Sequence, residues 1–210
     1  MIYSVEKKGT QVVQENTASG TEARGNARLR YEIDAEDRIR WFDDNWSQFA
    51  EANDGPGLAH PDILGKSLWD FISDDITVSL YKKIISRVRD GRTTRFRLRC
   101  DGPDCRRLLE MHIDGDADGN VRFETVPINI ESRLPVALFS SKTERSPDLL
   151  RVCAWCNRVH VSNGNGKWVE VEEAVSHLQL FEQQRLPQLT HGICGACFAQ
   201  MTETVEKLDT

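Results

Sequence analysis

Alternating hydrophobic and polar residues in the first half of the chain predict β-strands on either side of a helical stretch. Leu29, Tyr31 and Ile33 alternate with polar residues, and Ile39 and Trp41 resume the alternation after an acidic turn. The same rhythm predicts three later strands, at residues 96–100, 107–113 and 121–126. The pattern therefore predicts two strands, then helices, then three more strands.

The helices between these strands are indicated by apolar residues that recur every three or four positions. A short helix carries Trp46 and Phe49, with Asp43 or Asp44 as its N-cap. A longer helix over residues 80–88 is apolar on one side and stops at Gly91. Together with the strands, these helices predict an α+β fold.

The last third of the chain predicts a small unit with a hairpin and a helix. Residues 159–161 and 167–169 flank Ser162–Gly166, whose Asn-Gly steps supply the positive φ values of a hairpin turn. A helix with one apolar face follows over residues 171–181, and Pro187 ends it. Residues 189–193 then return the chain toward its end.

Composition divides the chain into four parts. Residues 1–27 are poor in apolar positions and predict a disordered tail. Residues 28–132 form the sheet domain, and residues 133–150 form a linker with an apolar first half and a flexible second half. Residues 151–203 form the small C-terminal module, which is too short to bury much core by itself.

Four cysteines in this module predict a structural metal. Cys153 and Cys156 form one C-x-x-C pair, and Cys194 and Cys197 form another, the ligand set and spacing of tetrahedral Zn²⁺. Two other interpretations stay open: four buried small hydrophobes, and dithiol redox centres, which require a thioredoxin-like context that is not evident here. A c-type haem requires His after the second cysteine, where Asn157 and Phe198 stand.

Two histidines could replace a thiolate ligand. His191 lies three residues before Cys194, and His160 follows the first cysteine pair. We favour four cysteines, because the two pairs are complete without either imidazole. Neighbouring cations, Arg151 and Arg158 among them, would offset the negative charge of four thiolates on one zinc.

The module resembles a cysteine-rich unit found at the C-terminus of some bacterial signalling proteins that contain PAS domains. The resemblance covers about fifty residues and is most specific in His191-Gly192-Ile193-Cys194-x-x-Cys197. Relatives often carry Pro after the third cysteine, where this chain has Gly195. The resemblance implies metal binding and a signalling context.

The sheet domain in turn resembles a PAS domain. Residues 31–44 are similar to the family's opening hairpin, and Leu64–Ile72 is similar to its conserved "G-x-s-h-x-d-h-i" stretch. The resemblance implies an antiparallel five-stranded sheet and a pocket between sheet and helices, whose ligand is unknown. Among possible cofactor ligands, His112 is the strand-borne candidate for a haem axial position. A lone strand histidine is more often a surface or core residue.

Charge gives a second interpretation of the strands. Arg95, Arg97 and Arg99 alternate on one face and could form a stripe for phosphates, with Arg106 and Arg107 across the turn. The formal net charge of −6 and pairing with Glu110 or Glu124 favour a solvated strand face instead. Nucleic acid is therefore not the expected partner.

The sequence contains no nucleophile elbow and no phosphate-binding loop, so we expect no enzymatic activity. It also contains no apolar run that could span a bilayer and no secretory leader, so we expect a cytoplasmic protein. The sequence predicts a bacterial signalling or regulatory protein with a PAS-like sensor or dimerisation domain and a zinc module that binds a partner protein. Self-association into a homodimer is left open. A nucleic-acid-binding regulator and a thiol redox protein are the alternatives.

Overall fold

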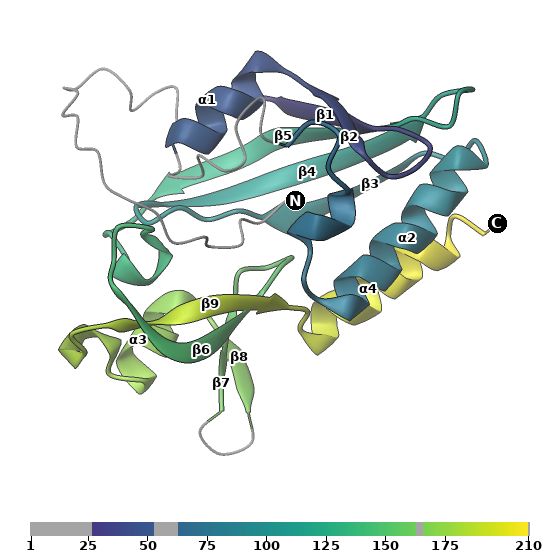
Figure 1. Ribbon diagram of the computed structural model, residues 1–210. Helices are drawn as coiled ribbons and strands as arrows, with labels where there is room; N and C mark the ends of the chain where they lie inside the picture. The colour runs from purple at the N-terminus through teal and green to yellow at the C-terminus, as the bar shows by residue number, and fades with distance from the viewer. Residues whose placement is uncertain (1–26, 53–62, 163–165, 210) are drawn as a thin grey trace.

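Figure 1 shows the computed structural model, which describes residues 27–52, 63–162 and 166–209. The predicted tail therefore lies outside the described residues, apart from Ala27. The described chain forms two β-sheets with helices packed around them. No described helix is both long enough and apolar enough to cross a membrane.

The first sheet has five antiparallel strands in the order β2-β1-β5-β4-β3. Its strands are β1 (Leu29–Ile33), β2 (Ile39–Phe42), β3 (Thr94–Arg99), β4 (Cys105–Gly115) and β5 (Val121–Ser132). Helices α1 (Asp44–Ala52) and α2 (Asp75–Arg89), with the 3₁₀ turn Leu68–Phe71, separate β2 from β3. The predicted α+β order is confirmed, and the five-stranded antiparallel sheet that the resemblance implies is present.

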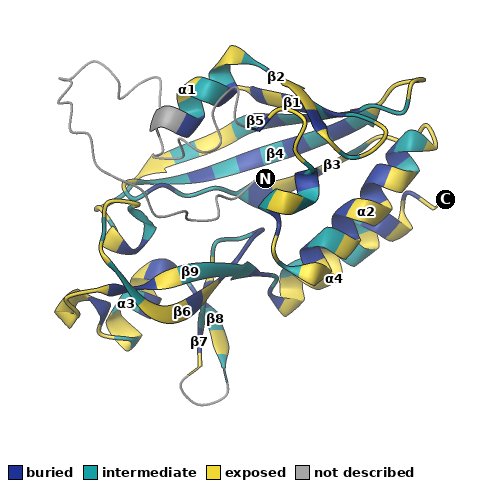
Figure 2. Ribbon diagram, in the orientation of Figure 1, coloured by how far each residue is buried: buried dark blue, intermediate teal, exposed yellow. Residues whose placement is uncertain are grey.

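Alternation along the strands produces the core, as predicted. Odd-numbered residues of β4 from Arg107 to Ile113 are buried, and the even-numbered ones between them are partly exposed. Tyr31 on β1 stacks on Phe123 of β5 with ring centroids 4.6 Å apart. Figure 2 shows buried residues alternating with more exposed ones along β4 in the middle of the sheet, as expected where one face is covered and the other faces solvent.

Helix α2 (Asp75–Arg89) ends just before Gly91, as predicted, but begins five residues before the predicted start at residue 80. The Asp74 side chain accepts a hydrogen bond from the Thr77 amide, and Gly91 follows the helix with φ of +88°. The buried face includes Tyr81, Ile84 and Val88. This face packs on the inner surface of the first sheet.

The C-terminal part contains a second sheet in the order β8-β7-β6-β9. Its strands are β6 (Arg145–Cys153), β7 (Val159–Val161), β8 (Lys167–Val169) and β9 (Leu186–Gly192), and the helices are α3 (Val171–His177) and α4 (Gly195–Glu206). The predicted hairpin is present as β7 and β8. Strands β6 and β9 pair in parallel, which the sequence did not indicate.

Three expectations for this part need correction. The flexible half of the predicted linker contains the start of β6, and Leu138 of the apolar half is buried in a 3₁₀ turn. The helix predicted over 171–181 ends at His177, because Gln179 takes a left-handed conformation and leaves Phe181 exposed. Pro187 lies inside strand β9, which is tolerated because β9 is at the sheet edge.

Helix α4 lies beside α2 of the first sheet's unit (Figure 1). It runs past the predicted end of the module at residue 203. Its buried residues Met201 and Val205 belong to the same apolar cluster as Tyr31, Ile84 and Phe123. The core of the five-stranded sheet therefore continues into the C-terminal part.

Candidate metal centre

The four cysteines meet because two distant segments end side by side. Strand β6 ends at Cys153, and β9, paired in parallel with it, ends at Gly192 opposite Cys153. Parallel strands that stop in register place the loops that follow them at the same sheet edge. The two C-x-x-C turns are those loops.

Each turn is held by local hydrogen bonds. In the first, the Asn157 amide donates to the Cys153 carbonyl at 2.9 Å, and Asn157 has a positive φ of 55°. In the second, Cys194 caps helix α4, and its sulfur accepts a hydrogen bond from the Cys197 amide at 3.4 Å. Tight turns of this kind aim both sulfurs of a pair toward one point.

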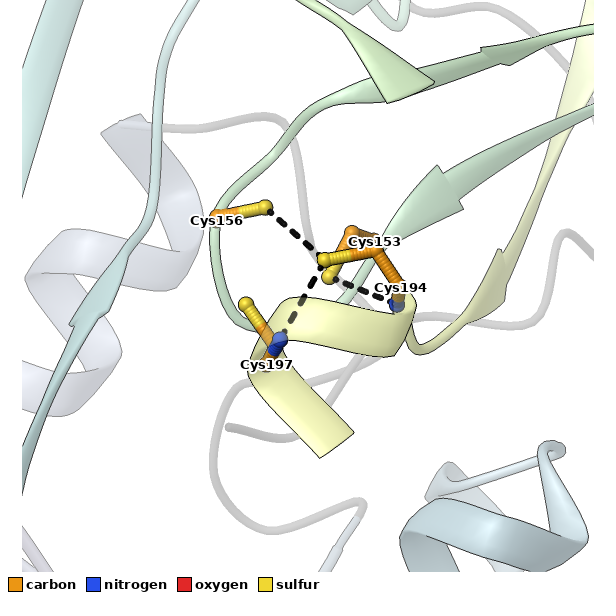
Figure 3. Close-up of side chains that lie close together, drawn as sticks. All are labelled: Cys153, Cys156, Cys194 and Cys197. Carbon is orange, nitrogen blue, oxygen red and sulfur yellow. Dashed lines mark hydrogen bonds between the residues drawn. The ribbon is translucent and has the colours of Figure 1, made fainter. Parts of the chain in front are cut away.

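The sulfurs of all four cysteines lie within 4.8 Å of one another, and Figure 3 shows them converging from the two turns. The Cys156 and Cys194 sulfurs are 3.8 Å apart. The Cys194 amide donates to the Cys153 sulfur at 3.4 Å, so backbone donors already face the thiolates. The donor set fits a divalent metal with soft ligands, and zinc in particular.

Crowding of four thiols makes their ionisation unequal. Hydrogen bonds from the Cys156 and Cys197 thiols lower the pKa of Cys153 to about 2. The hydrogen bond to Cys153 in turn raises the pKa of Cys156 to about 12, and that of Cys197 is raised as well. The first thiolate to form suppresses the ionisation of the neighbouring thiols. A bound cation would instead favour the thiolate form of all four cysteines.

The two candidate substitute histidines occupy different surroundings. Among the described residues, four cysteines and no histidine make up the one cluster suited to a metal. His160 packs against Trp168 with ring centroids 5.1 Å apart. His191 lies on β9 opposite Val152, and burial lowers its pKa to about 4, so its imidazole is neutral at pH 7.

Among the predicted neighbouring cations, Arg158 is the one with a clear electrostatic link to the cysteines. Its guanidinium lies 3.2 Å from Glu170, which raises the pKa of Arg158, and Cys156 contributes in the same direction. Arg151 instead packs its aliphatic stem along Gly192. A Cβ at position 192 would come to 3.0 Å from that stem, so a larger residue there would require Arg151 to shift.

Trp155, inside the first cysteine pair, enters the core of the five-stranded sheet's unit. It is 5% exposed, and its ring lies 5.7 Å from Tyr81 of α2 and 6.5 Å from Phe96 of β3. Its carbonyl accepts a hydrogen bond from the Arg99 amide at 2.7 Å. The cysteine turn is therefore a shared part of both units.

Ion pairs also connect the five-stranded sheet's unit to the C-terminal unit close to Trp155. We call these residues the junction network: Arg99, Asp101, Arg133, Glu170 and Glu172. The side chain of Asp101 is fully buried and pairs with Arg99 and Arg133, while Arg99 also lies 2.7 Å from Glu170 of the C-terminal unit. Burial alone would lower the pKa of Arg99, but hydrogen bonds to Asp101 and Glu170 raise it. Arg133 lies 3.4 Å from Glu172.

Replacing Asp101 with Asn tests this network. The change removes the buried one of the two carboxylates that pair with the guanidinium of Arg133 and weakens the hold on Arg99, so we expect a loss of about 3 kcal/mol in unfolding free energy. Asp104→Asn, at an exposed position in the same loop, is the matched control and should cost less than about 0.5 kcal/mol. Equal stability of the two variants in urea titrations would show that the network does not hold the junction.

The predicted arginine stripe is divided between solvent and the junction. Arg97 lies 3.8 Å from Glu110 across the strands, in line with a solvated face. Arg99 belongs to the junction network, and Arg106 lies 2.8 Å from Glu172. Arg107 is buried and donates to the Cys100 carbonyl.

His112, the candidate haem ligand, and two further cysteines lie apart from the four-cysteine cluster. His112 is on the half-exposed face of β4, 2.8 Å from Glu110, and does not point into the core. Cys100 and Cys105 flank the β3–β4 turn as free thiols. Burial raises the pKa of Cys100, which makes that thiol a poor nucleophile.

Sequence reasoning missed the roles of Trp155, Asp101 and Glu170. A tryptophan between two metal-binding cysteines is a visible signal, because such a large apolar side chain needs a surface to cover it. Asp101 and Glu170 carry no comparable signal, since their partners are distant in sequence. Their pairing becomes evident only when the two units are placed together.

No family model matches this sequence, and no curated protein matches it. Among solved structures, the chain is similar to a sensory box sensor histidine kinase from Vibrio cholerae, with 12% identity and a TM-score of 0.35. That match covers 50% of this chain and 84% of the other.

Proposed function

We propose that this chain is a bacterial signalling or regulatory protein in which a zinc centre joins a PAS-like domain to a partner-binding C-terminal module. The observation that carries the proposal is the position of the first cysteine turn. Cys153 and Cys156 belong to the metal cluster, and Trp155 between them packs on Tyr81 and Phe96. A change in either unit can therefore reach the other through one short loop.

The metal in this proposal is structural zinc. A tetrahedral site with four thiolates leaves no open position for water or substrate, so we assign no catalytic step to it. Cys153 and Cys194 are buried, and the turns have their own hydrogen bonds, as expected of a rigid site. Zinc coordination would hold β6, β9 and α4 together at the point where they meet.

The PAS-like domain is proposed to act through contacts rather than through a bound cofactor. In its core, Tyr31 packs on Phe123, Phe123 on Tyr81, and Tyr81 on Trp155. The proposed output is binding to a protein partner. The proposed compartment is the reducing cytoplasm, where cysteine clusters of this kind bind metal rather than form disulfides.

The nucleic-acid alternative has less support in the geometry. A phosphate-binding stripe needs several free arginines on one face, whereas Arg99 and Arg106 pair with acidic residues of the C-terminal unit. Retention on DNA or RNA at low salt that weakens steeply with added salt would restore this alternative.

The redox alternative requires two reactive dithiols. Here the four sulfurs form one cluster within 4.8 Å, so each pair would be shielded by the metal. We expect all four thiols to resist alkylation until zinc is removed by a chelator.

Native mass spectrometry of the full chain tests the zinc assignment. We expect one zinc per chain in the wild type and in Cys100→Ser, whose thiol lies outside the cluster. Cys197→Ser should lose the metal or hold it far more weakly. A wild type that carries no zinc after purification in zinc-supplemented medium, or a Cys100→Ser variant that loses it, would contradict the assignment.

A further inference from the structure

A groove of about 1040 Å³ follows the seam between α2 and α4, on residues that the zinc centre does not use. Its apolar lining includes Ile76 and Phe198, which are 48% and 44% exposed although both are large. Exposed apolar residues gathered in a groove are typical of a surface that another molecule covers.

The two helices that form the groove run in the same direction. Ile76 and Phe198 lie near their N-terminal ends, and Arg87 pairs with Asp209 at their C-terminal ends. Figure 1 shows α2 and α4 side by side along their length. The apolar end of the groove thus lies at the start of both helices.

The two walls of the groove carry opposite charge. Lys83 projects from α2, and Glu206 is exposed on α4. Within the part of the chain that the structure describes, neither of them makes an ion pair. The α2 wall is net basic, with three cations against Asp75, and the α4 side is acidic, so the groove is complementary to a copy of itself.

The geometry points to a second copy of this chain as the occupant, in a two-fold dimer whose axis runs parallel to α2 and α4. Such an axis places α2 of one copy against α4 of the other and keeps all four helices parallel. Ile76 then meets the Phe198 of the partner copy, and Lys83 meets its Glu206. Each contact occurs twice.

Helix spacing allows both contacts to form together. Lys83 follows Ile76 by seven residues and Glu206 follows Phe198 by eight, so the paired positions are separated by about 10.5 and 12 Å along the two helices. Each interval is close to two helical turns, which keeps both residues of a wall on one face. An axis perpendicular to the helices would instead make the facing helices antiparallel, so the two contacts could not form together.

Charge reversal in the zinc-loaded full chain tests the dimer, with sedimentation equilibrium from micromolar to millimolar concentration as the readout. The groove is small for a permanent interface, so we expect a weak, concentration-dependent dimer in the wild type. Lys83→Glu and Glu206→Lys should each weaken it about tenfold, because the two-fold axis repeats every changed contact. The combined Lys83→Glu and Glu206→Lys variant should recover most of the wild-type affinity.

Two further variants complete the test. Ile76→Asp should abolish dimerisation, whereas Lys142→Glu, an exposed charge reversal outside the groove, should leave it unchanged. Circular dichroism and zinc content confirm that each variant is folded. A wild type that stays monomeric at every concentration overturns the inference, and so does a dimer that neither single reversal weakens or that the combined variant fails to restore.

Discussion

Replacing Cys194 with Ser is expected to release zinc and to destabilise the whole chain, including the five-stranded sheet. Structural zinc contributes on the order of 10 kcal/mol, as much as the total stability of an ordinary domain. The C-terminal unit should therefore unfold in the variant. Trp155 and Met201 would then leave the core that they share with Phe123 and Ile84, which lowers the stability of the first unit.

This expectation differs from the one that the sequence alone supports. Two units separated by a linker should melt independently, so that residues 29–131 would remain folded without zinc. The shared apolar cluster and the junction network lead us to expect one cooperative transition in the wild type and a lower, broader one in Cys194→Ser. Cys105→Ser, a thiol outside the cluster, should melt like the wild type.

Replacing Trp155 with Ala is expected to cost about 3 to 5 kcal/mol in unfolding free energy while the four metal ligands stay in place. The side chain is 5% exposed and contacts the rings of Tyr81 and Phe96, so its removal leaves a cavity at the junction. Chemical denaturation of the zinc-loaded variant measures the loss.

Two matched variants separate packing from other effects. Trp41→Ala removes a tryptophan that is 42% exposed and should cost less than about 1 kcal/mol. Trp155→Phe keeps an aromatic ring and removes an indole N–H that has no hydrogen-bond partner, so it should retain most of the stability. If Trp155→Ala is no less stable than Trp41→Ala, the tryptophan does not join the units.

The five-stranded sheet could be predicted because its strands and turns are specified by residues that are close together in the sequence. Alternation along β4 and the acidic turns after β1 and β4 define strands and hairpins within a few residues. Strand β4 is two residues longer at each end than predicted, and the extent of β5 was underestimated more. It continues to Ser132 because residues 127–132 pair with the start of β4, although their own alternation is weaker.

The C-terminal unit was harder to predict because its sheet depends on a non-local pairing. Strands β6 and β9 are about forty residues apart in sequence and pair in parallel, which no local pattern reveals. Helix α4 did carry a signal, since Met201, Val205 and Leu208 recur at helical spacing and are all buried.

The cysteine spacing predicted a single four-sulfur cluster, and the structure brings those four residues together. What the spacing could not indicate is the environment outside the turns. Trp155 is buried because it packs on Tyr81 and Phe96, and Arg99 is drawn out of the arginine stripe by its ion pair with Glu170. These contacts follow from how two units pack, which short motifs do not encode.

Hydrogen–deuterium exchange of the zinc-loaded wild type and of Cys194→Ser tests most directly whether the zinc centre is built into the sheet domain. We expect the variant to lose amide protection throughout residues 145–209 and also in α2 and β3, which contact Trp155. Loss of protection confined to residues 145–209, with α2 and β3 as protected as in the wild type, would contradict the account.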